Sequence, residues 1–194
     1  MRVFIAPEMP DPPAPGATAL LWVRLAPGEG RAAARRVVRA ALERLLQRWL
    51  GAGEHWREGA RGPRVVVPGY CASVSYAGDW AVLALGRACR VGADLVSLSA
   101  LPADGGELSS IAHAFLSPAV ATGMDRQPPE LQPQAFARAW AAMEAASKAL
   151  GLELAEWRPA REAALQTCRC TFPPAPDGVC LAVAWAPPLP RAGA

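Results

Sequence analysis

A carboxylate and an ammonium group face the same way on a helix that the sequence predicts strongly. The segment Phe136 to Gly151, FARAWAAMEAASKALG, is rich in alanine and has no internal glycine or proline, so helix propensity favours it. Glu144 and Lys148 stand four residues apart, with Trp140 one turn earlier, and the three therefore share one face. The pattern fits a surface ion pair worth roughly a few tenths of a kcal/mol, or a charged site.

A second charged position lies about fifty residues upstream, inside an apolar run. Asp94 belongs to Arg90 to Leu98, RVGADLVSL, whose residues favour a strand. An ionised carboxylate in such a run is costly unless it is paired or bound to a cation. Together, the two segments require partners for their charges, which favours the site over the surface pair.

The two segments together resemble the paired signature of the 4'-phosphopantetheinyl transferase superfamily. Its motifs read roughly G-x-D-(I/L)-(E/V) and (F/W)-(T/A/C)-x-K-E-A-x-x-K-A-x-G. The order and separation of the motifs also agree with the family. The matching positions are Gly92, Asp94, Trp140, Glu144, Ala145, Lys148, Ala149 and Gly151.

The resemblance implies a specific reaction. Members transfer the 4'-phosphopantetheine group of coenzyme A to a serine of an acyl or peptidyl carrier protein and release 3',5'-ADP. By resemblance, Asp94 and Glu144 hold Mg²⁺, or Mn²⁺ in its place, against the pyrophosphate, and Lys148 contacts the phosphate. Glu144 or a metal-bound water then removes the proton of the serine. The expected catalytic residues are these three.

Several positions depart from the family's pattern and leave an alternative open. Met143 stands where the family has a lysine, and Val96 stands where the longer members have a second acid. The short trimeric holo-acyl-carrier-protein synthases share the G-x-D-I-V arrangement and bind their metal with the Asp and the helix Glu. The alternative is a weakened or inactive transferase-like module that binds a carrier protein or another partner.

Coenzyme-binding residues are expected in two segments before Asp94. Ser75 and Tyr76 resemble the family's N-x-S-H segment, although tyrosine stands where histidine is usual. Arg61 and Arg64 lie where the longer members tend to carry a Gly-Lys-Pro lysine, which this chain lacks. A guanidinium binds phosphate well, but these two residues are equally consistent with plain loop arginines.

The elements expected to position these residues give an α+β fold. Patterning predicts strands at 18–25, 90–98, 164–172 and 179–186, a hairpin at 72–85, and helices at 31–50 and 108–116. Loops are expected at 51–63, 102–106 and 124–133, and the arginines of helix 31–50 are expected to form a solvated face. The resemblance implies two similar halves, 1–98 and 99–194, about a pseudo-twofold axis with coenzyme A between them.

Composition limits the other classes of function. The chain has 194 residues, 52% hydrophobic and 19% charged, which is typical of a globular protein. A net charge of +3 suits an anionic ligand but is too small to indicate nucleic acid. No apolar run predicts a membrane span or a signal-peptide core, so a cytoplasmic protein is expected. Five irregularly spaced cysteines predict free thiols, and the length suggests a monomer.

Overall fold

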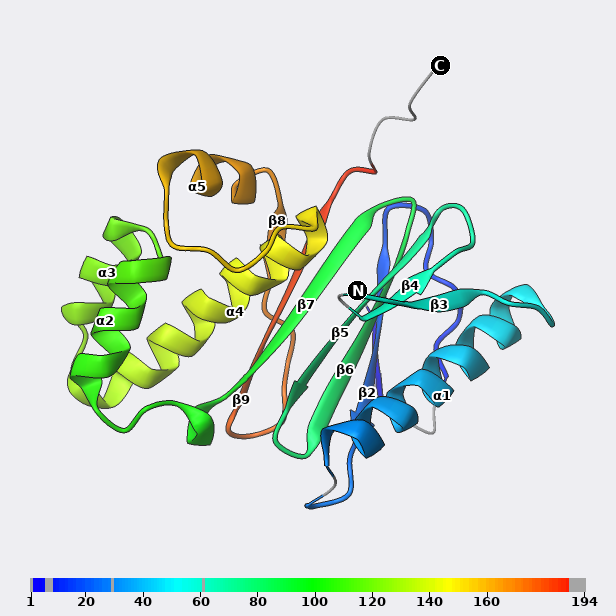
Figure 1. Cartoon of the computed structure of the whole chain (residues 1–194), viewed down its shortest axis with the longest axis horizontal. Coiled ribbons are helices and arrows are strands. Elements are labelled where there is room, and N and C mark those ends of the chain that lie inside the picture. The colour runs from blue at the N-terminus through cyan, green and yellow to red at the C-terminus, as the bar shows by residue number, and fades with distance from the viewer. Residues whose placement is uncertain (1, 6–8, 29, 61, 189–194) are drawn as a thin grey trace.

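Two mainly antiparallel sheets, each with one long helix packed on it, form the body of the protein (Figure 1). The computed structural model describes residues 2–5, 9–28, 30–60 and 62–188. The first sheet has the order β1-β2-β6-β5 and the second the order β7-β9-β8. The predicted α+β class is confirmed, whereas the pseudo-twofold relation of two halves stays a prediction.

The first sheet is built from the N-terminal segments. Its strands are β1 (Arg2–Ile5), β2 (Thr18–Arg24), β5 (Tyr70–Ala77) and β6 (Trp80–Arg87). Only the β1 to β2 pair is parallel. The predicted hairpin at 72–85 is confirmed, and its turn has Gly78 in the left-handed region at φ 54°. Helix α1 (Arg31–Leu50) has the predicted bounds and packs its leucines against this sheet.

The second sheet contains the strand that carries Asp94. Strand β7 (Arg90–Ser97) pairs antiparallel with β9 (Val179–Ala186), which pairs with the short β8 (Arg169–Thr171). Strand β7 also lies beside β5 without a backbone ladder between them. Strand β7, which belongs to the predicted half 1–98, therefore pairs with β9, which belongs to the predicted half 99–194. The division of the chain at residue 98 stays a prediction.

Helix α4 (Gln132–Leu150) lies directly on β7 and β9. Its contact face is made of alanines that meet alanines of β9, and such small side chains allow a close approach. The predicted helix is confirmed, and Gly151 ends it in the left-handed conformation at φ 71°. Gly92 of β7 is where the approach is closest, because a Cβ there would lie 2.0 Å from the carbonyl oxygen of Ala145.

The remaining helices form a layer beside α4. They are α2 (Gly105–Phe115) and α3 (Pro118–Asp125), with the 3₁₀ turns η1 (Leu98–Ala100) and η2 (Pro129–Leu131), followed by α5 (Pro159–Leu165). The helix predicted at 108–116 is confirmed as α2. Helix α3 was not predicted, although Ser117 caps it and Pro118 occupies its first turn.

Three predicted segments are wrong in part. The predicted loop at 124–133 contains η2 and overlaps the end of α3 and the start of α4. The predicted loop at 51–63 contains β3 (Trp56–Gly59), which pairs with β4 (Gly62–Val65) as a short hairpin. The predicted strand at 164–172 begins as the end of α5, because Pro159 starts a helical turn there, and only Arg169–Thr171 is strand. Within the described ranges, no helix is long and apolar enough to cross a membrane.

Candidate active site

One cavity of about 950 Å³ collects the predicted site residues. Strands β5 and β7 and helix α4 contribute Ser75, Tyr76, Asp94, Glu144 and Lys148 to its lining. Helix α1 adds arginines, and α2 and α4 add apolar side chains. The cavity therefore combines carboxylates, cations and an apolar surface, which is the mixture that a large, polar, phosphorylated ligand requires.

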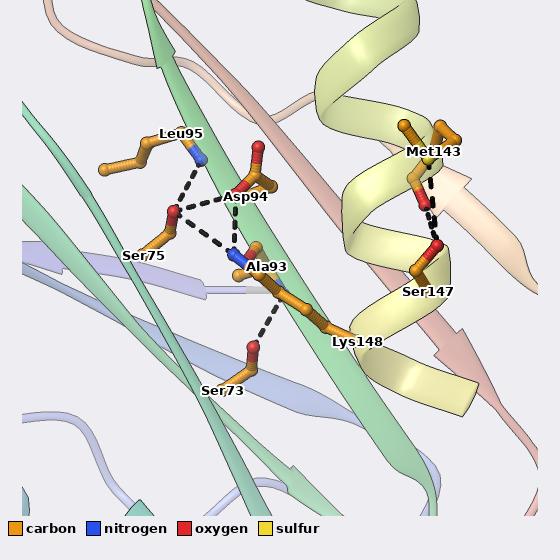
Figure 2. A network of polar contacts seen from close by, with 8 residues as sticks. All are labelled: Ser73, Ser75, Ala93, Asp94, Leu95, Met143, Ser147 and Lys148. Atoms are coloured by element: carbon orange, nitrogen blue, oxygen red, sulfur yellow. Dashed lines mark hydrogen bonds and ion pairs between the residues drawn. The ribbon is translucent and has the colours of Figure 1, made fainter. Parts of the chain in front are cut away.

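Asp94 is paired with Lys148 in the wall of this cavity. The Nζ of Lys148 lies 2.6 Å from Oδ1 of Asp94 and also donates to the carbonyl oxygen of Ala93 at 3.1 Å. Asp94 is only 7% exposed. Figure 2 shows Lys148 reaching from α4 toward Asp94 and Ser75. The partner that the buried aspartate needs is thus the lysine of the second motif.

The serines of β5 replace the missing backbone ladder between β5 and β7. The Oγ of Ser75 accepts from the N–H of Leu95 at 3.0 Å and donates to Oδ1 of Asp94 at 2.9 Å. The Oγ of Ser73 accepts from the N–H of Ala93 at 3.0 Å. Ser75 is 6% exposed, so in this arrangement it holds the Asp94 carboxylate and the edge of β7 in place (Figure 2).

Substituting Ser75 by alanine is expected to destabilise the protein by about 2 kcal/mol, because a buried N–H and a buried carboxylate each lose a partner. The free energy of unfolding from urea titration measures this. Ser97→Ala is the control and should cost under about 0.5 kcal/mol, since among the described residues the Ser97 hydroxyl bonds only the exposed Ser99. Equal values for the two variants would contradict the role given to Ser75.

The carboxylate of Glu144 is incompletely hydrogen-bonded. Within the described residues, its half-buried carboxylate has one oxygen, Oε1, that is fully covered and has no hydrogen-bond partner. Burial raises the pKa of Glu144, the charge of Asp94 raises it further, and the charges of Lys148 and Arg161 oppose this. A second cation between the two carboxylates would relieve both effects.

The donor set fits a magnesium ion. No group of three or more His, Cys, Asp or Glu side chains that could hold a metal occurs in the described part of the chain. Asp94 and Glu144 would be the protein's two ligands. Mg²⁺ is usually bound by one or two carboxylates, with water and substrate phosphates completing its coordination. The Oε1 atom of Glu144, which has no hydrogen-bond partner among the described residues, supports this fit, because a bound cation would give that oxygen a partner.

Arg161 of α5 reaches the turn of α4 that carries Glu144. Its Nη2 donates to the Oγ of Ser147 at 2.8 Å and lies 3.9 Å from the Sδ of Met143. Its Nη1 donates to the carbonyl oxygen of Glu153 at 2.7 Å. A positive charge therefore stands beside the position where Met143 replaces the family's lysine. No pattern in the sequence indicates this contact, because it depends on how α5 folds back.

The prediction that the arginines of α1 form a solvated face is wrong in part. Arg31, Arg35 and Arg39 line the cavity, and Arg39 is only 16% exposed. Arg39 forms a two-pronged ion pair with Glu58 at 2.6 and 2.7 Å and donates to the Oη of Tyr76 at 3.1 Å. The three arginines recur every four residues, a spacing that places them on one helix face and could have revealed them.

The two arginines predicted to replace the missing lysine fare differently. Arg64 is exposed on β4 and is not among the residues that line the cavity. Arg61 lies outside the described residues. Tyr76 lines the cavity as predicted, and its hydroxyl is held by Arg39. Among the described residues, the α1 arginines, rather than Arg64, are the guanidinium groups that line the cavity.

The carboxylates and the lysine that meet in the cavity lie in a segment that matches the model of a known family. Residues 90–176 match the family model of the 4'-phosphopantetheinyl transferase superfamily. This part of the chain belongs to that superfamily. A search of the curated proteins finds no match to the chain.

The phosphopantetheinyl transferase segment and the segment before it contribute different groups. Asp94, Glu144 and Lys148 lie within residues 90–176, whereas Ser75 and the α1 arginines precede the match. Membership of this segment in the superfamily supports a transferase activity and, in general terms, the transfer of phosphopantetheine. The carboxylates and the lysine therefore come from the family segment, and the extra cations come from the N-terminal sheet and its helix.

Proposed function

We propose that this protein is a phosphopantetheinyl transferase that uses coenzyme A to modify a serine of an acyl or peptidyl carrier protein and releases 3',5'-ADP. The observation that supports the proposal is the meeting of Asp94, Glu144 and Lys148 in one cavity that also holds the α1 arginines. Two carboxylates beside a lysine suit a divalent cation and a pyrophosphate. The arginines suit further phosphate charge.

Coenzyme A binding draws on the cationic side of the cavity. The coenzyme carries a pyrophosphate and a third phosphate, and each gains from a charge-assisted hydrogen bond to a guanidinium. Arg31 and Arg35 are exposed and line the cavity. Arg39 is held by Glu58 and Tyr76 and is therefore pre-positioned. These arginines take the part that the resemblance gives to lysine and histidine.

Arg35→Gln is expected to weaken coenzyme A binding about tenfold, because one charge-assisted hydrogen bond is worth about 1.5 kcal/mol. Isothermal titration with coenzyme A measures the change. Arg36→Gln is a matched control, since Arg36 is an exposed neighbour on the same helix that does not line the cavity. If Arg36→Gln weakens binding as much as Arg35→Gln, only the net charge matters and the assignment fails.

Asp94 and Glu144 would hold Mg²⁺, or Mn²⁺ in its place. When bound, the ion would neutralise pyrophosphate charge and so make the phosphorus easier to attack. Lys148 adds a further positive charge at the same point and keeps Asp94 oriented. Ser75 fixes Asp94 from the other side. Between them, these residues hold the phosphates still while the bond changes occur.

Glu144 is the proton acceptor of the proposed reaction. In the metal-free protein, burial and the charge of Asp94 raise the pKa of the Glu144 carboxyl group, and a raised pKa favours uptake of a proton by a carboxylate. The serine Oγ of the carrier protein attacks the β-phosphorus and its proton passes to Glu144. The bond from this phosphorus to the oxygen of 3',5'-ADP breaks, and Glu144 later returns the proton to solvent.

The apolar part of the cavity suits the pantetheine arm. Leu101, Ile111, Phe136 and Trp140 line it, and the Trp140 ring stacks on Phe136 with centroids 5.4 Å apart. Pantetheine carries a gem-dimethyl group and a long aliphatic chain, which gain from such a surface. Trp140 thus has a role in binding the group that is transferred.

Release of 3',5'-ADP tests the proposal. The chain is incubated with coenzyme A, Mg²⁺ and a panel of apo carrier proteins, and nucleotides are separated by liquid chromatography. We expect 3',5'-ADP only when a carrier protein is present, and none with a chelator of divalent metals. Binding of a carrier protein without any release of 3',5'-ADP would support the alternative, a non-catalytic carrier-binding module.

A further inference from the structure

Two cysteines outside the cavity lining have converging thiols. Cys71 lies on β5 and Cys89 lies in the turn between β6 and β7. A Cβ built on Gly86, which faces Cys71 across the sheet, would lie 2.8 Å from the Sγ of Cys71 and 2.9 Å from that of Cys89. Both sulfur atoms therefore occupy the space next to the same glycine.

The turn before β7 is bent in a way that brings Cys89 back to β5. Ala88 adopts a left-handed conformation at φ 53°, which is uncommon for a residue with a side chain. Its N–H donates to the carbonyl oxygen of Gly69 at 2.7 Å. The Sγ of Cys71 in turn donates to the carbonyl oxygen of Cys89 at 2.8 Å. These bonds tie the turn that carries Cys89 to the start of β5.

The two thiols differ in acidity and in access. The neighbouring Cys71 thiol lowers the pKa of Cys89 to about 7, while Cys89 and burial raise the pKa of Cys71. The lowered pKa favours the thiolate, the reactive form of cysteine, at Cys89 over Cys71. Cys89 is 9% exposed and Cys71 is half-buried, so a small oxidant is favoured over a bulky one.

We propose that Cys71 and Cys89 form an oxidisable dithiol, a modification site for oxidants of the peroxide class. The Cys89 sulfur attacks an oxygen of hydrogen peroxide, the O–O bond breaks, and a sulfenic acid and one water form. The Cys71 sulfur then attacks the Cys89 sulfur, the S–S bond forms, the S–O bond breaks, and a second water leaves. The two thiols lose two electrons, the peroxide gains them, and both thiol protons end in water.

The disulfide would join the start of β5 to the turn before β7. Ser75 of β5 also joins these two strands, through its hydrogen bonds to Asp94 and Leu95 of β7. The inference does not depend on the proposed transferase activity, because the two cysteines lie outside the cavity lining. The other three free cysteines, Cys168, Cys170 and Cys180, lie near β8 and β9 and serve as internal controls.

The test is oxidation of the full chain with hydrogen peroxide, followed by alkylation and mass spectrometry. We expect a mass loss of about 2 Da before alkylation, a non-reduced peptide that links Cys71 to Cys89, and a Tm higher by roughly 5 °C. Dithiothreitol should reverse all three changes. The Cys168→Ala/Cys170→Ala double variant should behave in the same way.

A single-thiol variant separates the two chemical steps. In Cys71→Ala, Cys89 has no resolving partner and should gain about 16 or 32 Da without any linked peptide or rise in Tm. Recovery of Cys71 and Cys89 as separate peptides from the oxidised wild type would overturn the proposal. So would a link confined to the other three cysteines, or oxidation of Cys89 beyond the sulfenic acid with Cys71 still free.

Discussion

Replacing Glu144 by glutamine is expected to lower the rate of phosphopantetheine transfer by at least about 100-fold while the protein stays folded. The amide keeps the shape of the side chain but has no charge for a cation and no capacity to take the proton of the serine. Because Glu144 serves the proposed reaction in both ways, the loss should appear in kcat. Binding of coenzyme A to the α1 arginines should change little.

The same substitution should leave the metal-free protein as stable as the wild type at low pH and more stable above it. Burial and the charge of Asp94 raise the pKa of Glu144 above its ordinary 4.5, so the folded state binds a proton more tightly than the unfolded state. The contribution of Glu144 to stability is therefore fully present below about pH 4.5 and is lost as the pH rises through the raised pKa. Glutamine has no such loss.

Urea unfolding at several pH values with a metal chelator measures this difference between wild type and Glu144→Gln. Glu130→Gln is the control, since Glu130 is exposed on η2 and should change neither activity nor the pH profile. An active Glu144→Gln enzyme would remove Glu144 from the mechanism. A stability difference that does not grow with pH would contradict the origin given for its raised pKa.

Gly92→Ala is expected to cost more than about 4 kcal/mol or to prevent folding. A Cβ at Gly92 would lie 2.0 Å from the carbonyl oxygen of Ala145 and 2.5 Å from the amide nitrogen of Ala149. Both atoms belong to the backbone of α4 and cannot rotate away. Helix α4 would have to move off β7, which would also separate Lys148 from Asp94.

Far-UV circular dichroism and urea titration of the variants measure this effect. Gly123→Ala is a matched control, because Gly123 lies in α3, has an ordinary φ and would bring its Cβ within 4 Å of nothing. It should stabilise the protein by roughly 0.5 kcal/mol, since alanine is the better helix former. A Gly92→Ala variant within about 1 kcal/mol of wild type would show that α4 does not approach β7 as described.

The sequence predicted the elements of the site better than its contacts. Periodicity and Gly151 located helix α4, and the apolar run located β7. Asp94 was expected to need a partner, and the structure identifies Lys148 as that partner. The spacing of Glu144 and Lys148 is a local property of one helix, so it could be read directly from the chain.

The contacts that were missed join segments distant in sequence. Arg39 reaches Tyr76 and Glu58 from α1, and Arg161 reaches Ser147 from α5. An amphipathic pattern shows which face of a helix is buried, but it does not show that the edge of the polar face lines a cavity. Arg161 contacts Ser147 from α5, which was predicted in part as strand, so this contact could not be inferred from the sequence.

The intact mass of an apo carrier protein tests the central proposal most directly. After incubation with the chain, coenzyme A and Mg²⁺, we expect a gain of about 340 Da, one phosphopantetheine, that maps to a single serine. The gain should vanish with a chelator, and with Glu144→Gln over the same time. No gain on any of several carrier proteins, with a protein shown to be folded and to bind coenzyme A, would contradict the proposed transferase activity.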